Sequence, residues 1–292
     1  MNTEAVTTGE LAELLMRGRN ADGGWGYYAG KASRLEPTCW AILALGTQLA
    51  AKGGRGVLAE WPSRDGLLLE RHGGDPNYGF HGLAFLTLLA AGTEHIAGNS
   101  TLAAGMQRAQ GLTFEDSPYF RQNNKLVGWS WVAGTFGWVE PTAWCLLALK
   151  KWARLPGAHA DPGRIDQAEQ LLLDRVCKPA GWNYGNSNAL GQDLQPYVPT
   201  TAIALLAMQD RRTDPAIERS VKFLEAQGMS ELAGSSLALA TQALGIYERP
   251  TAVVRATLSQ QLPMTMAFGN QASIAAALCA VQTDHPDVAF KL

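Results

Sequence analysis

The sequence predicts an all-α protein in which six helical hairpins close into a ring with an inner and an outer layer of helices, an (α/α)6 toroid. An apolar segment of about ten residues recurs six times along the 292-residue chain. Each copy is apolar on nearly every face, whereas the segments between the copies carry charged residues at helical spacing. A helix that is apolar all round must be buried, so the alternation indicates a buried inner layer wrapped by amphipathic helices.

The clearest copies of the inner segment are residues 36–45 and 140–149, which share Glu-Pro-Thr-x-Trp and are identical at most positions. A third copy is 198–207, and weaker copies are 80–89, 234–243 and 269–278. Pro37, Pro141 and Pro199 fall where a helix is expected to begin, a position that tolerates proline. The mean spacing of about 47 residues leaves room for one helical hairpin per copy.

The outer layer is predicted at residues 11–17, 165–176, 217–227 and 252–262, where charged and apolar residues alternate at helical spacing. Six hairpins that close into a circle leave no exposed end, so no capping repeat is needed. We therefore expect a single toroid domain over residues 1–292.

Composition excludes several classes of protein. A net charge of −2 provides no basic footprint for nucleic acid. With 47% hydrophobic and 17% charged residues, the chain has enough apolar material for a large core. The apolar runs are shorter than a membrane helix requires, and the first residues do not resemble a secretory signal. The four cysteines are widely spaced, which favours reduced thiols in a cytoplasmic protein.

A glycine–aromatic loop precedes three of the inner segments, at residues 22–27, 128–131 and 181–185. A Gly-x-Trp after an outer helix, followed by a Thr-led inner helix, resembles the repeat of squalene–hopene and oxidosqualene cyclases. Traces of that family's glutamine–tryptophan motif are present at 222–227 and 23–25. The resemblance covers essentially the whole chain, and the same toroid occurs in protein prenyltransferase β-subunits. It implies a terpene cyclase-like fold and an isoprenoid or other hydrophobic small-molecule ligand.

The prenyltransferase resemblance would imply a zinc site with an Asp-x-Cys pair. Here Asp174 and Cys177 have a different spacing, and the histidines lie in no comparable context. We expect neither zinc nor any other cofactor.

The cyclase resemblance implies an acid that protonates an alkene or epoxide, placed in the motif Asp-x-Asp-Asp-Thr-Ala. The matching stretch is 138–143, in which Glu140 takes the proton-donating position while Trp138 and Pro141 replace the flanking aspartates. A helix N-terminus favours the ionised form of Glu140. Only a dry, apolar setting would oppose this effect by raising its pKa.

The starts of the inner helices are expected to face one mouth of the ring, which would bring Glu36, His81 and Glu140 to adjacent sectors of its rim. Two carboxylates beside a histidine could act as an acid–base site. They could also bind a divalent metal ion. Alternatively, the glutamates cap their own helices by accepting backbone N–H bonds.

Aromatic residues recur at equivalent repeat positions, Trp40 and Trp144 among them, and the resemblance implies an aromatic wall that stabilises carbocations. Packing of the hairpins is the alternative for each residue. Asp193, in a long loop, is a candidate lid residue. The candidate substrate-binding residues are Trp25, Trp129, Trp131, Trp138, Trp182, Tyr184, Tyr197 and Asp193.

These observations predict a class II terpene cyclase-like protein, in which Glu140 starts a cyclisation or isomerisation assisted by His81 or Glu36. The alternative is a non-catalytic binding or scaffold protein with the same fold. Known cyclases of this type build their cavity between two helical domains and this chain supplies one. A second subunit would complete the site, unless the cavity lies within the ring. Peripheral contact with a membrane is the other partner that we consider.

Overall fold

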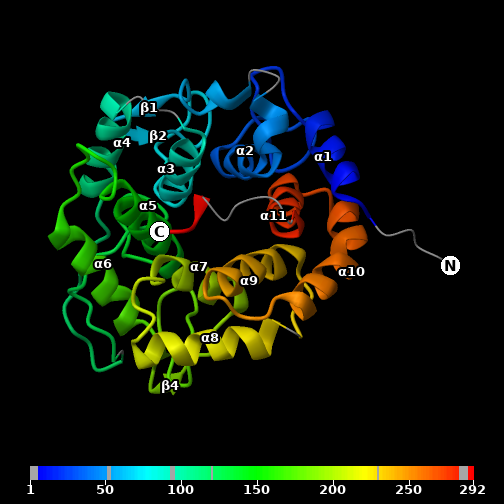
Figure 1. The fold of residues 1–292 in the computed structure, drawn as a ribbon. Coiled ribbons are helices and arrows are strands. Elements are labelled where there is room, and N and C mark those ends of the chain that lie inside the picture. Colours follow the sequence, from blue (N-terminus) through cyan, green and yellow to red (C-terminus); the bar gives the residue numbers. More distant parts are fainter. Residues whose placement is uncertain (1–5, 51–53, 93–95, 120, 229, 283–288) are drawn as a thin grey trace.

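The computed structural model describes residues 6–50, 54–92, 96–119, 121–228, 230–282 and 289–292. These residues form eleven α-helices, one 3-10 turn and two short antiparallel hairpins (Figure 1). The elements are α1 (Thr8–Arg17), α2 (Leu35–Ala50), η1 (Gly54–Val57), β1 (Ser63–Arg64), β2 (Leu67–Leu68), α3 (His81–Ala90), α4 (Ile96–Arg108), α5 (Val139–Trp152), α6 (Pro162–Asp174), β3 (Asn188–Ala189), β4 (Gln192–Asp193), α7 (Val198–Ala207), α8 (Pro215–Gly228), α9 (Gly234–Ile246), α10 (Ala252–Phe268) and α11 (Gln271–Val281).

Six helices form the inner ring: α2, α3, α5, α7, α9 and α11. Each packs against the next in chain order, and α11 packs against α2, so the ring is closed (Figure 1). Each inner helix begins within two residues of the start that the repeat predicts. The all-α toroid is therefore confirmed.

The outer layer consists of α1, α4, α6, α8 and α10 (Figure 1). Four of these helices coincide with the predicted amphipathic segments. The fifth, α4, was not predicted because its sequence is rich in small and uncharged residues. Between α2 and α3 the described residues contain no outer α-helix, and η1 and the β1–β2 hairpin occupy that place. The second repeat therefore departs from the helical hairpin that we expected.

The inner helices are buried almost all round, as their sequences predict. In α3, for example, every residue from His81 to Leu88 is buried. Close packing of α3 on α5 depends on Gly82, because a Cβ atom there would lie 2.4 Å from the backbone nitrogen of Cys145. None of the four cysteines forms a disulfide. Within the described residues, no helix combines the length and the apolar character that crossing a membrane requires.

The three glycine–aromatic loops, in each of which a glycine directly precedes the tryptophan, join the two layers by a repeated set of hydrogen bonds. The backbone N–H of each loop tryptophan donates to a threonine Oγ1 in the following inner helix, at 2.9 Å in all three cases. Each indole N–H donates to a carbonyl near the end of the preceding outer helix, at 2.6–2.8 Å. The three sets are Trp25 with Thr38 and Leu15, Trp129 with Thr142 and Met106, and Trp182 with Thr201 and Leu172.

Candidate active site at the mouth of the ring

The N-terminal ends of the inner helices surround a pocket of about 240 Å³. Five of the six inner helices contribute their second and sixth residues, which lie one above the other because they are four residues apart. The second positions form an upper layer of Glu36, Glu140, Pro199, Ser235 and Ala272. The sixth positions form a deeper, apolar layer of Trp40, Trp144, Ile203, Leu239 and Ala276.

Glu36 is held by a neighbouring hydroxyl group. The Tyr27 hydroxyl donates a hydrogen bond to Glu36 Oε2 at 2.6 Å. Burial raises the pKa of Glu36 to about 7, and the negative charge of Glu70 adds to the increase, while the hydrogen bond from Tyr27 opposes it. Glu36 therefore keeps a proton much more readily than an exposed glutamate does.

Glu140 is the second acidic residue of the pocket. Burial raises its pKa to about 7, and the nearby charge of Glu36 contributes to the increase. The Trp144 indole, one turn further along α5, lowers the pKa slightly, although its N–H forms no hydrogen bond of ordinary geometry. The helix N-terminus also favours the ionised form. Since burial and repulsion are the larger effects, the pair retains a proton near neutral pH.

His81 does not join the two glutamates. It directly follows Phe80, the residue at the start of α3 that lines the pocket, so its side chain projects about 100° away from the direction of Phe80. Its Nδ1 accepts a hydrogen bond from the Leu68 backbone N–H at 3.0 Å, and burial lowers its pKa to about 4. The acid–base role predicted for His81 therefore has no support in its position.

Three of the predicted substrate-binding tryptophans also lie elsewhere. Trp25, Trp129 and Trp182 are fully buried, and their indoles bond to the outer helices as described above. Because these side chains are enclosed between the two layers, they pack the hairpins and do not line the pocket. Hairpin packing, the alternative to substrate binding in the sequence analysis, therefore fits these three residues.

The remaining predicted residues lie near the start of the inner helices but do not line the pocket. Trp131 packs edge-on against Phe80, which does line it, with ring centroids 5.2 Å apart. Trp138 stacks on Phe136 at 4.7 Å. Tyr184 and Tyr197 pack against each other at 5.2 Å, and each is about half exposed.

Asp193 belongs to the β3–β4 hairpin and is held by surrounding polar groups. It forms ion pairs with Arg121 and with Lys178, the latter at 3.0 Å, and accepts a hydrogen bond from Asn188. Hydrogen bonds from Lys178 and Asn188 and the charge of Arg121 lower its pKa, so it is ionised. These contacts fix the hairpin, and none of them involves the pocket.

The sequence reasoning missed three features of this site. Tyr27 was not singled out, although it follows the tryptophan in the first glycine–aromatic loop. Trp40 and Trp144 were noted only as recurring residues, yet they line the pocket directly beneath Glu36 and Glu140. Their spacing of four residues from each glutamate was the signal that could have identified them.

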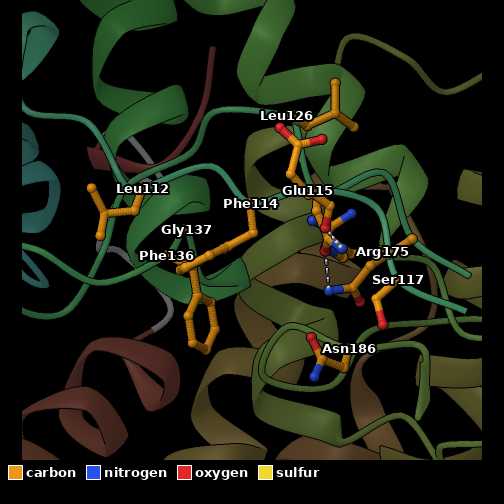
Figure 2. Close-up of a pocket in the computed structure, with 11 residues that line it drawn as sticks. Leu112, Phe114, Glu115, Ser117, Leu126, Phe136, Gly137, Arg175 and Asn186 are labelled. Carbon is orange, nitrogen blue, oxygen red and sulfur yellow. Dashed lines mark hydrogen bonds between the residues drawn. The ribbon is translucent and has the colours of Figure 1, made fainter. Parts of the chain in front are cut away.

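A second pocket, of about 350 Å³, lies among the loops that precede α5 and α7 and shares no lining residue with the first. Figure 2 shows Leu112 and Phe136 on one side of it and Arg175, Ser117 and Asn186 on the other. Arg175 is paired with Asp174, so its charge is already matched. This pocket lacks the paired carboxyls of the first, because Glu115 is the one acidic residue among its described lining residues.

No metal site is formed by the residues that we expected to face the mouth. Over the described ranges, no group of three or more histidine, cysteine, aspartate or glutamate side chains is arranged to hold an ion. Glu36 and Glu140 are instead a pair of half-buried acids whose raised pKa values would let them hold a proton near neutral pH.

Known structures share this fold. The type II terpene cyclase MstE from Scytonema matches 96% of this chain and 97% of its own, with a TM-score of 0.60 and 12% sequence identity. A variant of MstE in complex with merosterolic acid A, described as its product, has a TM-score of 0.61 at 12% identity, with 96% of both chains covered. No sequence profile of a protein family matches the chain, and no curated protein has a similar sequence. The chain therefore has the fold of a type II terpene cyclase.

Proposed function

We propose that this protein binds an isoprenoid or a similar hydrophobic molecule at the mouth of its ring and catalyses an acid-initiated cyclisation or isomerisation. The observation that carries the proposal is the pair of glutamates, both with a pKa raised to about 7, each with a tryptophan directly beneath it in the pocket. Perturbed acids in a concave pocket are typical of catalytic sites. The likeness to a terpene cyclase supports the choice of ligand class.

The two carboxyls have different roles in this proposal. Glu36 accepts the hydrogen bond of Tyr27, and a hydrogen bond to the charged form favours ionisation. No hydroxyl group among the described residues donates a hydrogen bond to Glu140, and the charge of Glu36 is one of the causes that raise its pKa. Glu140 is therefore the carboxyl that carries the proton, and Glu36 is its anionic partner.

The strength of the acid limits the substrate. A carboxyl with a pKa near 7 holds its proton at neutral pH, but it gives that proton up less readily than an ordinary carboxyl does. An epoxide oxygen or another basic oxygen accepts a proton far more easily than a bare alkene. We therefore favour an oxygen-bearing substrate. The faces of Trp40 and Trp144 could stabilise the positive charge that follows protonation.

One observation favours the rival proposal of a binding or scaffold protein. The cyclase motif that the sequence resembles flanks its acid with aspartates, and here Trp138 and Pro141 take those places. Trp138 stacks on Phe136 and offers Glu140 no activating carboxyl. A second subunit that completes the site stays a further possibility for the same fold.

Glu140→Gln separates these proposals. Glutamine keeps the shape of the side chain but cannot donate the proton, so turnover of a prenyl epoxide should disappear while the protein stays folded. Products would be identified by mass spectrometry, and folding by thermal melting. Glu13→Gln, at an exposed position on α1, is the matched control. Turnover that survives in Glu140→Gln would eliminate Glu140 as the acid, and absence of turnover in the wild-type protein would favour the binding protein.

A further inference from the structure

The segment Ala289–Leu292 lies inside the ring (Figure 1). Lys151, in the last turn of α5, donates hydrogen bonds to the carbonyls of Ala289 at 3.0 Å and Lys291 at 3.2 Å. Gln209, just after α7, donates to the carbonyl of Phe290 at 2.7 Å and accepts from the N–H of Leu292 at 2.9 Å. The segment is therefore bound at the C-terminal ends of the inner helices, opposite the pocket.

Phe290 is the side chain that this segment inserts into the ring. It is only 4% exposed, and its ring centroid lies 5.7 Å from that of Trp40 and 5.6 Å from that of Trp144. The two indoles pack edge-on against each other at 6.1 Å. The same indoles form the deeper layer of the pocket. The pocket and Phe290 therefore share one wall, approached from opposite ends of the ring.

The depth of the pocket limits the size of its ligand. About 240 Å³ corresponds to the liquid volume of roughly eight water molecules. Carbon groups of similar size would fill it at about eight atoms, which is between one and two isoprene units. A longer chain that stays inside the ring would have to displace Trp40 and Trp144 and would meet Phe290 directly behind them.

We propose that Phe290 supports the aromatic floor of the pocket from behind and thereby sets the length of the isoprenoid chain that the pocket accepts. This inference rests on the proposed function, because it assumes a prenyl ligand. Phe290→Ala removes about six carbon atoms, slightly more than one isoprene unit, so it should lengthen the preferred chain by about one unit. Phe290→Trp should disfavour the longest chains.

The test is a binding series on the full chain. Prenyl alcohols of about 10, 15 and 20 carbons would be titrated against the intrinsic tryptophan fluorescence, since Trp40 and Trp144 line the pocket. The wild-type protein should prefer the shortest alcohol. In Phe290→Ala the affinity for the 15-carbon alcohol relative to the 10-carbon alcohol should rise at least tenfold. Phe290→Leu is a milder variant that gives the same direction of change if Phe290→Ala does not fold.

Phe85→Leu is the control for a general loosening of the core. Phe85 is fully buried and packs against Trp152, but it does not line the pocket, so its substitution should leave the preferred length unchanged. If the wild-type protein binds the alcohols and both Phe290→Ala and Phe290→Leu keep the same preference, the role of Phe290 is refuted while the proposed function stands. If no alcohol binds any variant, the isoprenoid proposal itself fails, and the role of Phe290 with it.

Discussion

The raised pKa values of Glu36 and Glu140 predict how stability depends on pH. Both values rise from an ordinary 4.5 to about 7 in the folded protein. Below about pH 4.5 a carboxyl is protonated in both states and has no effect. Between 4.5 and 7 the unfolded chain loses its proton while the folded protein keeps it, so the free energy of unfolding falls as pH rises. Above about pH 7 the carboxyl is ionised in both states, and the free energy of unfolding falls no further.

The size of the effect follows from the same values. At about 1.4 kcal/mol per pH unit, the interval from 4.5 to 7 corresponds to about 3 kcal/mol for one carboxyl. Both side chains are partly open to the pocket, and the helix N-termini favour their ionised forms, so we expect about 2 kcal/mol. Glutamine carries no charge at any of these pH values. The variant Glu140→Gln should therefore gain stability over the wild-type protein as the pH rises. The difference in the free energy of unfolding between the two proteins should be about 2 kcal/mol more favourable to the variant at pH 8 than at pH 5.

Urea denaturation at pH 5 and pH 8 measures this difference directly. Glu36→Gln should show the same sign. The double variant should show less than the sum, because the charge of Glu36 raises the pKa of Glu140 and either single substitution already removes that repulsion. Glu13→Gln, which is exposed, should show almost no change between the two pH values. If Glu140→Gln gains less than about 0.5 kcal/mol between pH 5 and pH 8, Glu140 ionises freely and cannot be the acid.

Three further predictions test the packing of the ring by urea denaturation. Gly82→Ala should lower the free energy of unfolding by about 1–3 kcal/mol because the added carbon would collide with the α5 backbone. Gly98→Ala in α4, with no atom near its added carbon, should raise it by about 1 kcal/mol. Equal effects would contradict this account of the helix contact. Thr142→Val should cost about 1–3 kcal/mol because it leaves the buried Trp129 N–H without its acceptor, and a neutral outcome would mean that the loop bond is dispensable. Lys150→Ala should lower the free energy of unfolding by about 3 kcal/mol because buried Glu169 would keep only the half-exposed Arg211 as an ion-pair partner. Unchanged stability would show that Arg211 alone is enough to compensate the charge of Glu169.

The fold was predictable because nearly every position of the inner helices is apolar, which indicates burial on all faces. A segment such as 140–149 is apolar all round only if neighbours surround it, and six such segments at similar spacing require a closed arrangement. Where burial was partial, the sequence was less informative. α4 carries small and uncharged residues that give no clear helical stripe, and the β1–β2 hairpin has only two residues in each strand.

The site was only partly predictable because it depends on helical phase. Glu36 and Glu140 both occupy the second position of an inner helix, and their identical surroundings in the sequence place them at one mouth. His81 is shifted by one residue, and an error of one position turns a side chain by about 100°. The tryptophans that recur most regularly, such as Trp25 and Trp129, serve the hairpins, since a repeated structural contact produces a repeated residue.

Residues that differ between repeats therefore carry the specific chemistry of this ring. The second position is Glu in α2 and α5 but Pro, Ser and Ala in α7, α9 and α11, so the charge lies on one side of the mouth. The sixth position is Trp beneath each Glu and smaller in the other three helices. A ligand that enters would thus meet both acids and both indoles on the same side. In the proposed reaction the acid that starts the chemistry and the aromatic faces that receive the resulting positive charge come from the same two helices.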